Sequence, residues 1–180
     1  MDKLEIIGGR TLQGSIEVSG SKNASLPIIA SCILSNKIVL KNVPLVKDIE
    51  TMLNLLSSIG SKIKINHQSK TIKIENSKKL KTIAKYQLVK TMRAGVLVLG
   101  PLLAKYGKAT VSLPGGCSIG PRPIDLHISA LKKMGAKIKI INGYIHATAK
   151  YGLKGAKINF KKVSVGATEN LIIAACMANG

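Results

Sequence analysis

The sequence has 180 residues, of which 46% are hydrophobic, and it contains one Phe and no Trp. This length and composition suit one folded domain with an aliphatic core and exclude a disordered tail. The net charge of +20 comes from 28 basic residues spread along the chain, with few aromatic side chains that could stack on bases. These features argue against a nucleic-acid-binding protein.

Cysteine usage and apolar runs exclude further classes of protein. Three Cys residues without metal-ligand spacing predict neither a disulfide framework nor a metal site. The apolar run 94–104 has about half the length of a membrane-spanning helix, and the acidic Asp2 does not suit a signal peptide. We therefore expect a cytoplasmic protein that binds no metal and no membrane.

The hydrophobic pattern alternates between the periods of strands and helices along the whole chain. Strands are predicted near residues 3–7, 14–18, 37–41, 62–66, 71–75, 108–112, 137–141, 144–148 and 156–160. Helices are predicted near residues 22–35, 47–59, 85–105, 123–134 and 167–178. Alternating elements with short links indicate an α/β (α+β) fold with packed layers.

Two stretches of the chain repeat each other. Residues 55–65 and 130–140 each read as a helix end, a glycine and an alternating strand, with Gly60 and Gly135 suited to a left-handed helix stop. Residues 12–18 and 153–159 form a second similar pair. The repeats predict about two and a half copies of one unit with two helices, the third copy being cut off.

The segment 113–127, with the sequence LPGGCSIGPRPIDLH, has the most specific composition for a functional loop. Its three Gly and three Pro suit a loop with special backbone angles. Cys117 lies five residues before Arg122, and a nearby cation makes a thiol more reactive. Cys32 and Cys176 lie in apolar helical patterns and are expected in the core. We therefore predict that Cys117 is the functional thiol.

Lysine or arginine also stands at several predicted helix starts. Lys22 lies in the turn 19–24, Arg93 precedes an apolar stretch, and Lys162 opens the segment 162–168. The start of a helix attracts anions, and a Lys there is unfavourable unless an anion is present. Because the repeats supply several such starts, we expect a shared pocket for a doubly anionic small ligand. Neither a Walker loop nor a GxGxxG motif occurs.

These motifs resemble one family along the whole chain. The segments SGSKNA (19–24), LVKTMRA (88–94), LPGGCSIGPRPIDLH (113–127) and KVSVGAT (162–168) are similar to those of UDP-N-acetylglucosamine enolpyruvyl transferases. The resemblance implies repeated βαβαββ units in an inside-out α/β barrel, with helices inside and sheets outside. It also implies transfer of the enolpyruvyl group of phosphoenolpyruvate to the sugar 3-hydroxyl through a tetrahedral ketal, with release of phosphate.

The resemblance also implies roles for individual residues. Cys117 would protonate the methylene carbon of phosphoenolpyruvate, while Lys22 and Asn23 would hold that substrate. The implied site for UDP-N-acetylglucosamine consists of Arg93, Arg122, Pro123, Ile124, Asp125, Leu126, Lys162, Val163, Ser164 and Val165. No cofactor is implied, the two substrates are the expected partners, and we expect a monomer.

The family comparison also predicts how the chain is divided. Residues 1–21 would be strands of a second domain, and residues 22–180 would be a first domain whose third repeat is truncated. The second domain, with its proton-accepting carboxylate, would be missing, so we expect weak binding and little turnover from this chain alone. Three alternatives stay open: an enzyme like enolpyruvylshikimate-phosphate synthase, an inactive fragment, and a basic nucleic-acid-binding module.

Overall fold

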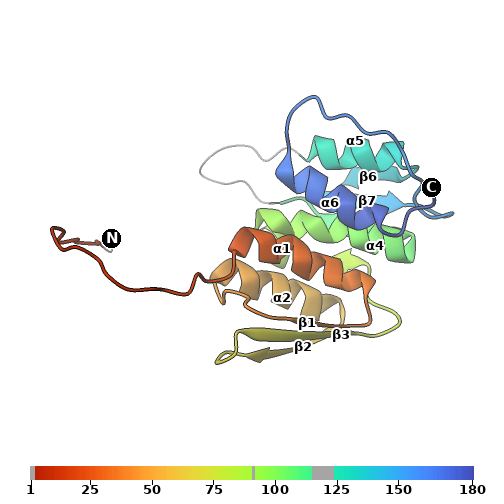
Figure 1. The fold of residues 1–180 in the computed structure, drawn as a ribbon. Coiled ribbons are helices and arrows are strands. Elements are labelled where there is room, and N and C mark those ends of the chain that lie inside the picture. Colours follow the sequence, from red (N-terminus) through yellow and green to blue (C-terminus); the bar gives the residue numbers. More distant parts are fainter. Residues whose placement is uncertain (1–2, 91, 115–123) are drawn as a thin grey trace.

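A computed structural model describes residues 3–90, 92–114 and 124–180. Helices form the interior and two sheets cover the outside, as expected (Figure 1). The long helices are α1 (Lys22–Ser31), α2 (Lys47–Ile59), α4 (Leu99–Tyr106), α5 (Asp125–Lys133) and α6 (Val165–Ala175). Shorter helical segments are η1 (Cys32–Leu34), α3 (Tyr86–Val89) and η2 (Arg93–Val98). In the described part of the chain, no helix is long and apolar enough to span a membrane.

The two sheets confirm the internal repeat. The first contains β1 (Lys37–Leu40), β3 (Thr71–Asn76) and β2 (Ser61–Asn66), in that order. The second has the order β4 (Ile83–Ala84), β5 (Lys108–Ser112), β7 (Tyr144–Thr148) and β6 (Lys137–Ile141). In each unit a strand and a hairpin are antiparallel in the same spatial order, and β4 adds a short parallel edge.

Local sequence explains the two helix stops that define the repeat. Gly60 ends α2 with a φ of 112°, and Gly135 follows α5 with a φ of 91°. Glycine adopts this left-handed conformation without the steric cost of a Cβ atom. A strand then begins in both units, β2 after Gly60 and β6 after Gly135.

The core lies between the helices and the inner faces of the sheets. On β3 the side chains of Ile72 and Ile74 are buried, while Lys73 and Glu75 between them are exposed. Helix α4 packs against α6, and its Leu99, Leu102 and Leu103 are fully buried. Alternation in the sheets and apolar stripes on the helices therefore meet in one aliphatic core.

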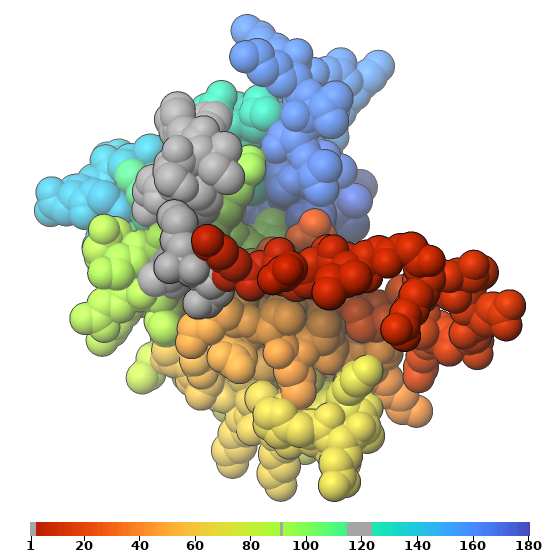
Figure 2. Space-filling view, turned by 90° about the vertical axis from the view of Figure 1, so that its left-hand side faces the viewer, coloured from red at the N-terminus to blue at the C-terminus, as the bar shows by residue number. Residues whose placement is uncertain are grey.

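Three predicted strands are wrong. Residues 3–7 and 14–18 form no strand but an exposed arm that extends away from the body (Figure 1) and lies toward the viewer in Figure 2. Residues 156–160 also form no strand. All three segments have strand-like patterns, but a strand needs a neighbouring edge to satisfy its backbone groups. The short strand β4 was not predicted, because two residues are too few for a periodic signal.

Several predicted helices differ from those observed. The predicted helix 85–105 is divided into α3, η2 and α4, and Gly95, Gly100 and Pro101 in this stretch weaken a continuous helix. The predicted helix 22–35 ends as a 3₁₀ turn after Ser31, and the predicted helix 167–178 is shifted to 165–175. The predicted helix 123–134 is observed as α5, which begins at Asp125 and ends at Lys133.

Candidate functional site

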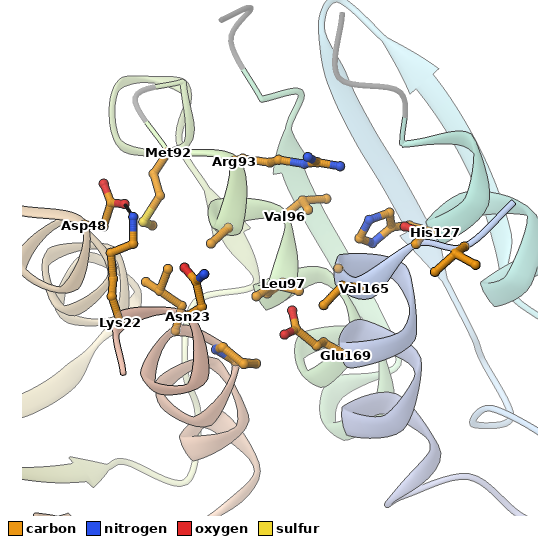
Figure 3. A pocket seen from close by; sticks show the side chains of 16 residues that line it. Lys22, Asn23, Asp48, Met92, Arg93, Val96, Leu97, His127, Val165 and Glu169 are labelled. Carbon is orange, nitrogen blue, oxygen red and sulfur yellow. Dashed lines mark hydrogen bonds and ion pairs between the residues drawn. The ribbon is translucent and has the colours of Figure 1, made fainter. Parts of the chain in front are cut away.

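The main candidate site is a cavity of about 600 Å³ where the N-terminal ends of α1, η2 and α6 meet (Figure 3). Each of the three helical segments begins a pseudo-equivalent part of the repeat. The predicted site residues that line the cavity are Lys22, Asn23, Arg93, Val163, Ser164 and Val165. The fold therefore brings together residues that lie far apart in the sequence.

Helices α1 and α6 begin with the same local structure. The hydroxyl of Ser21 accepts the amide hydrogen of Ala24 at 3.3 Å, and the hydroxyl of Ser164 accepts that of Ala167 at 3.3 Å. The carbonyls of both serines also accept side-chain hydroxyl hydrogens from the next turn, at 2.8 and 2.9 Å. Other first-turn amides have no acceptor within a helix, and together with the helix dipole they favour an anion.

The cation at the start of α1 already has an anionic partner in this structure. The Nζ of Lys22 donates to Oδ2 of Asp48 at 2.8 Å, and both side chains are partly exposed. The sequence argument that Lys22 implies an external anion was therefore incomplete, because a carboxylate from α2 supplies one. An exposed ion pair of this kind is worth only ~0–1 kcal/mol, so it competes weakly with a phosphate or carboxylate ligand.

Two carboxylate side chains, Glu169 and Asp48, line the cavity but were not predicted as site residues. Glu169, on the second turn of α6, has its pKa raised by burial. Asp48 lies in the first turn of α2. Neither carboxylate belongs to a sequence motif that indicates a site, and only the packing of α2 and α6 around the cavity reveals them.

His127 is the most deeply buried polar side chain in the cavity wall, with 5% of its surface exposed. Its Nδ1 lies 3.0 Å from Nδ2 of Asn170, which is fully buried. Burial, followed by the positive charge of Arg93, lowers the pKa of His127 from 6.5 to about 4, against the opposing effect of Asp125. His127 is therefore a neutral imidazole at neutral pH.

The lowered pKa of His127 predicts that the protein loses stability as the pH falls. Between about 6.5 and about 4 the unfolded chain binds a proton at His127 that the folded chain does not. The free energy of unfolding should therefore decrease over this window, by about 2 kcal/mol near pH 5. Urea denaturation near pH 7 and near pH 5 should show this decrease in the wild type.

Two matched variants separate this contribution from other titrating groups. The change His127→Gln should remove most of the decrease, while His67→Gln, at an exposed position, should leave it intact. Equal pH dependence in the wild type and in His127→Gln would contradict the assignment.

The other predicted site residues do not line the main cavity in the described part of the structure. Ile124 and Asp125 line a neighbouring hollow of about 560 Å³ with Leu113 and Pro114, and Leu126 is half-buried on α5. Lys162 is exposed and lies just before the segment 163–166 that lines the main cavity. Cys117, Arg122 and Pro123 lie outside the described residues.

The other two cysteines differ from each other. Cys32 is buried as predicted, and burial raises the pKa of its thiol to about 11. The prediction that Cys176 lies in the core is wrong, because it is exposed at the C-terminal end of α6. The apolar pattern there did not distinguish the buried face of the helix from its exposed face. Within the described ranges, no group of three or more His, Cys, Asp or Glu side chains could hold a metal ion.

Comparison with known proteins supports the same interpretation of fold and motifs. Residues 6–180 match the family described as EPSP synthase (3-phosphoshikimate 1-carboxyvinyltransferase). A UDP-N-acetylglucosamine 1-carboxyvinyltransferase of Pelagibacter ubique is 65% identical over the whole chain, and one of Aliarcobacter butzleri is 55% identical. The chain spans 43% and 42% of these relatives, respectively, which is less than half of their length.

Solved structures share the fold at lower sequence identity. EPSP synthase of Acinetobacter baumannii has a TM-score of 0.72 and 20% identity, covering 93% of this chain and 39% of that protein. The enolpyruvyl transferase NikO of Streptomyces tendae has a TM-score of 0.68 and 17% identity, covering 82% of this chain and 32% of that protein. At this identity the similarity concerns the fold alone.

Proposed function

This chain belongs to the EPSP synthase (3-phosphoshikimate 1-carboxyvinyltransferase) family, and on that premise we propose that it is the part of an enolpyruvyl transferase that binds phosphoenolpyruvate and UDP-N-acetylglucosamine. The relatives with 65% and 55% identity carry the name of that activity. Because the chain spans less than half of their length, we propose that the activity of the whole enzyme also needs groups beyond these residues.

The observation that carries the proposal is the meeting of three helix starts at one cavity. Lys22 and Asn23 come from α1, Arg93 from η2 and Ser164 from the start of α6. Both proposed substrates are anionic, through a phosphate and carboxylate in one and a diphosphate in the other. First-turn amides, an ammonium and a guanidinium are groups that bind such oxygens.

The proposed reaction assigns a proton transfer to Cys117. The sugar 3-hydroxyl oxygen bonds to C2 of phosphoenolpyruvate while C3 accepts a proton from the thiol, which gives a tetrahedral ketal. Phosphate then leaves from C2 and C3 returns a proton to the thiolate of Cys117, which restores the double bond, yields the enolpyruvyl ether and regenerates the thiol. A base must also take the hydroxyl proton, and we propose that it comes from the part of the enzyme outside this chain.

Lys22 and Asn23 are proposed to hold phosphoenolpyruvate. UDP-N-acetylglucosamine is proposed to bind Arg93, Arg122, Pro123, Ile124, Asp125, Leu126, Lys162, Val163, Ser164 and Val165. The ammonium group of Lys22 lies at the cavity, and its exposed ion pair with Asp48 is weak enough to be replaced by contacts with an anionic substrate.

We further propose that residues 1–21 belong structurally to a second domain. The described part of this arm carries apolar side chains that are 81–94% exposed: Leu4, Ile6, Ile7, Leu12, Ile16 and Val18. Soluble proteins rarely expose this many apolar side chains in one segment. The segment therefore suits strands that pack against another sheet. On this proposal the enzyme acts in the cytoplasm, without a cofactor, in the first committed step of peptidoglycan synthesis.

A hybrid enzyme tests the proposal. In this hybrid, the chain replaces the matched segment of the Pelagibacter ubique relative. We expect release of phosphate from phosphoenolpyruvate that depends on UDP-N-acetylglucosamine, and at most weak binding without turnover from the 180-residue chain alone. Phosphate release that depends on shikimate 3-phosphate would favour the sister activity. A folded hybrid without turnover on either acceptor would contradict the proposal, with the unaltered relative as the positive control.

A further inference from the structure

A buried chain of hydrogen bonds connects three helices behind the cavity. The amide nitrogen of Gly100 on α4 donates to Oδ1 of Asn170 on α6 at 2.9 Å. Nδ2 of the same side chain lies 3.0 Å from Nδ1 of His127 on α5. Asn170 is fully buried and uses both ends of its amide in these contacts. The imidazole is thus the end of the chain that reaches the cavity wall.

The direction of these bonds follows from the backbone. An N–H group of the main chain can only donate, so the atom of Asn170 that faces Gly100 must be its oxygen. The atom that faces His127 is therefore the NH₂ group, which can only donate. Nδ1 of His127 must then be the acceptor, and the proton of the neutral imidazole resides on Nε2.

Packing keeps the amide in this orientation. A Cβ atom added at Gly100 would collide with Oδ1 of Asn170, so glycine permits the close approach of α4 and α6. Reversing the amide would place two donors against each other at Gly100 and leave Nδ1 of His127 facing an acceptor. In a fully buried position such mispairing is costly.

The Nε2 edge of His127 faces the first turn of α6. A Cβ atom added at Gly166 would lie 3.8 Å from both Nε2 and Cε1 of His127. Arg93, from η2, lines the same side of the cavity in Figure 3. The imidazole edge, the amides at the start of α6 and the guanidinium all offer hydrogen-bond donors to this region, a set that suits an anionic oxygen.

We propose that Asn170 is a positioning residue that holds His127 as the neutral Nε2–H tautomer, so that the imidazole is a fixed hydrogen-bond donor to an anionic oxygen of the substrate. The identity of that substrate rests on the proposed function, whereas the tautomer does not. In this role His127 is neither a general base, because its free lone pair is engaged, nor a cation.

The charged groups around His127 support a neutral ring. Protonation of Nδ1 would set an N–H against the NH₂ of Asn170. It would also add a buried positive charge near Arg93, and these effects agree with the lowered pKa. Asp125 on α5 opposes this effect, and Glu169 on α6 lines the same cavity. Donation from Asn170 and repulsion by Arg93 thus act in the same direction.

Nitrogen-15 NMR of the labelled chain tests the tautomer directly, because the chain contains only three His residues. Signals that disappear in His127→Gln identify the ring. In the wild type we expect an unprotonated Nδ1 and a protonated Nε2 across the neutral pH range. A protonated Nδ1 in the wild type at neutral pH would overturn the proposal, whatever the variants do.

The isosteric change Asn170→Asp tests whether Asn170 determines the tautomer of His127. A carboxylate can accept from Gly100 but cannot donate to His127, so the proton should move to Nδ1 and the pKa of His127 should rise. Asn54→Asp, the same chemical change at an exposed position of α2, should leave the His127 signals unchanged. Unaltered His127 signals in folded Asn170→Asp would overturn the role of Asn170.

The donor role is tested by the affinity of the hybrid enzyme for UDP-N-acetylglucosamine as a function of pH. In Asn170→Asp the imidazolium keeps its Nε2–H at low pH, but the neutral ring at high pH presents a lone pair. Affinity should therefore fall roughly ten-fold as the pH rises through the pKa of His127, and stay level in the wild type. Equal pH profiles in the two proteins would overturn the donor role, while a failure of the proposed function would show as absence of binding in both, with the tautomer result unaffected.

Discussion

Replacing Cys117 with Ser should lower the turnover of the hybrid enzyme by roughly 10²–10⁴-fold, the contribution that general acid catalysis typically makes. A serine hydroxyl is a far weaker acid than a thiol and cannot readily protonate the methylene carbon of phosphoenolpyruvate. A carboxylic acid can donate a proton, so Cys117→Asp should retain a measurable part of the activity. Phosphate release with both substrates present, measured over a range of pH, compares the three proteins. Equal activity in the Ser and Asp variants would contradict the assignment.

The other two thiols serve as internal controls for Cys117. An epoxide phosphonate of the fosfomycin type should modify Cys117 first. Cys32 should react slowest because its thiol is buried and has its pKa raised to about 11. Cys176 is exposed, so it reports the rate of an accessible thiol outside the candidate site. Peptide mapping that finds Cys176 labelled as fast as Cys117 would show that Cys117 is not specially activated.

Changing Arg93 to Lys should weaken the binding of UDP-N-acetylglucosamine to the hybrid enzyme by roughly ten-fold or more. The positive charge is kept, but the planar fork that can grip an anionic group with two hydrogen bonds is lost. The second bond to a charged group is worth about 1.5–3 kcal/mol, which sets this magnitude. Isothermal titration calorimetry measures the affinity directly.

A conservative change on the outer face of a sheet provides the control for Arg93. Lys64 is exposed on β2, away from the residues that line the cavity, and Lys64→Arg should leave the affinity unchanged. Since Arg93 also lowers the pKa of His127 by its charge, and Lys keeps that charge, the pH dependence of stability should be the same in Arg93→Lys and the wild type. Similar affinity in Arg93→Lys and the wild type would mean that Arg93 acts only as a point charge.

Features that depend on short stretches of sequence were predicted correctly. The helix stops at Gly60 and Gly135, the strands that follow them and the repeat of one unit all appear in the structure. Each depends on local causes, namely a glycine that tolerates a left-handed backbone and an apolar residue at every second position. The motif segments 19–24 and 162–168 were likewise found from sequence, and the fold brings both to one cavity.

Predictions that depend on a neighbouring element of the fold were less accurate. Residues 3–7, 14–18 and 156–160 have the composition of strands but form none, because a strand exists only where another edge accepts its hydrogen bonds. Cys176 lies in an apolar helix but on a face that is exposed. In these cases the local pattern led to a wrong prediction, because the surrounding structure and not the pattern decides pairing and burial.

The sequence alone predicted the repeated α/β architecture, the family resemblance and six of the residues that line the candidate cavity. Only the tertiary structure revealed the pairing of Lys22 with Asp48 and the chain from Gly100 through Asn170 to His127. These contacts join residues 26, 70 and 43 positions apart. No local preference encodes such pairs, since the protonation state of a side chain depends on which helices pack around it and on the charges and donors they bring.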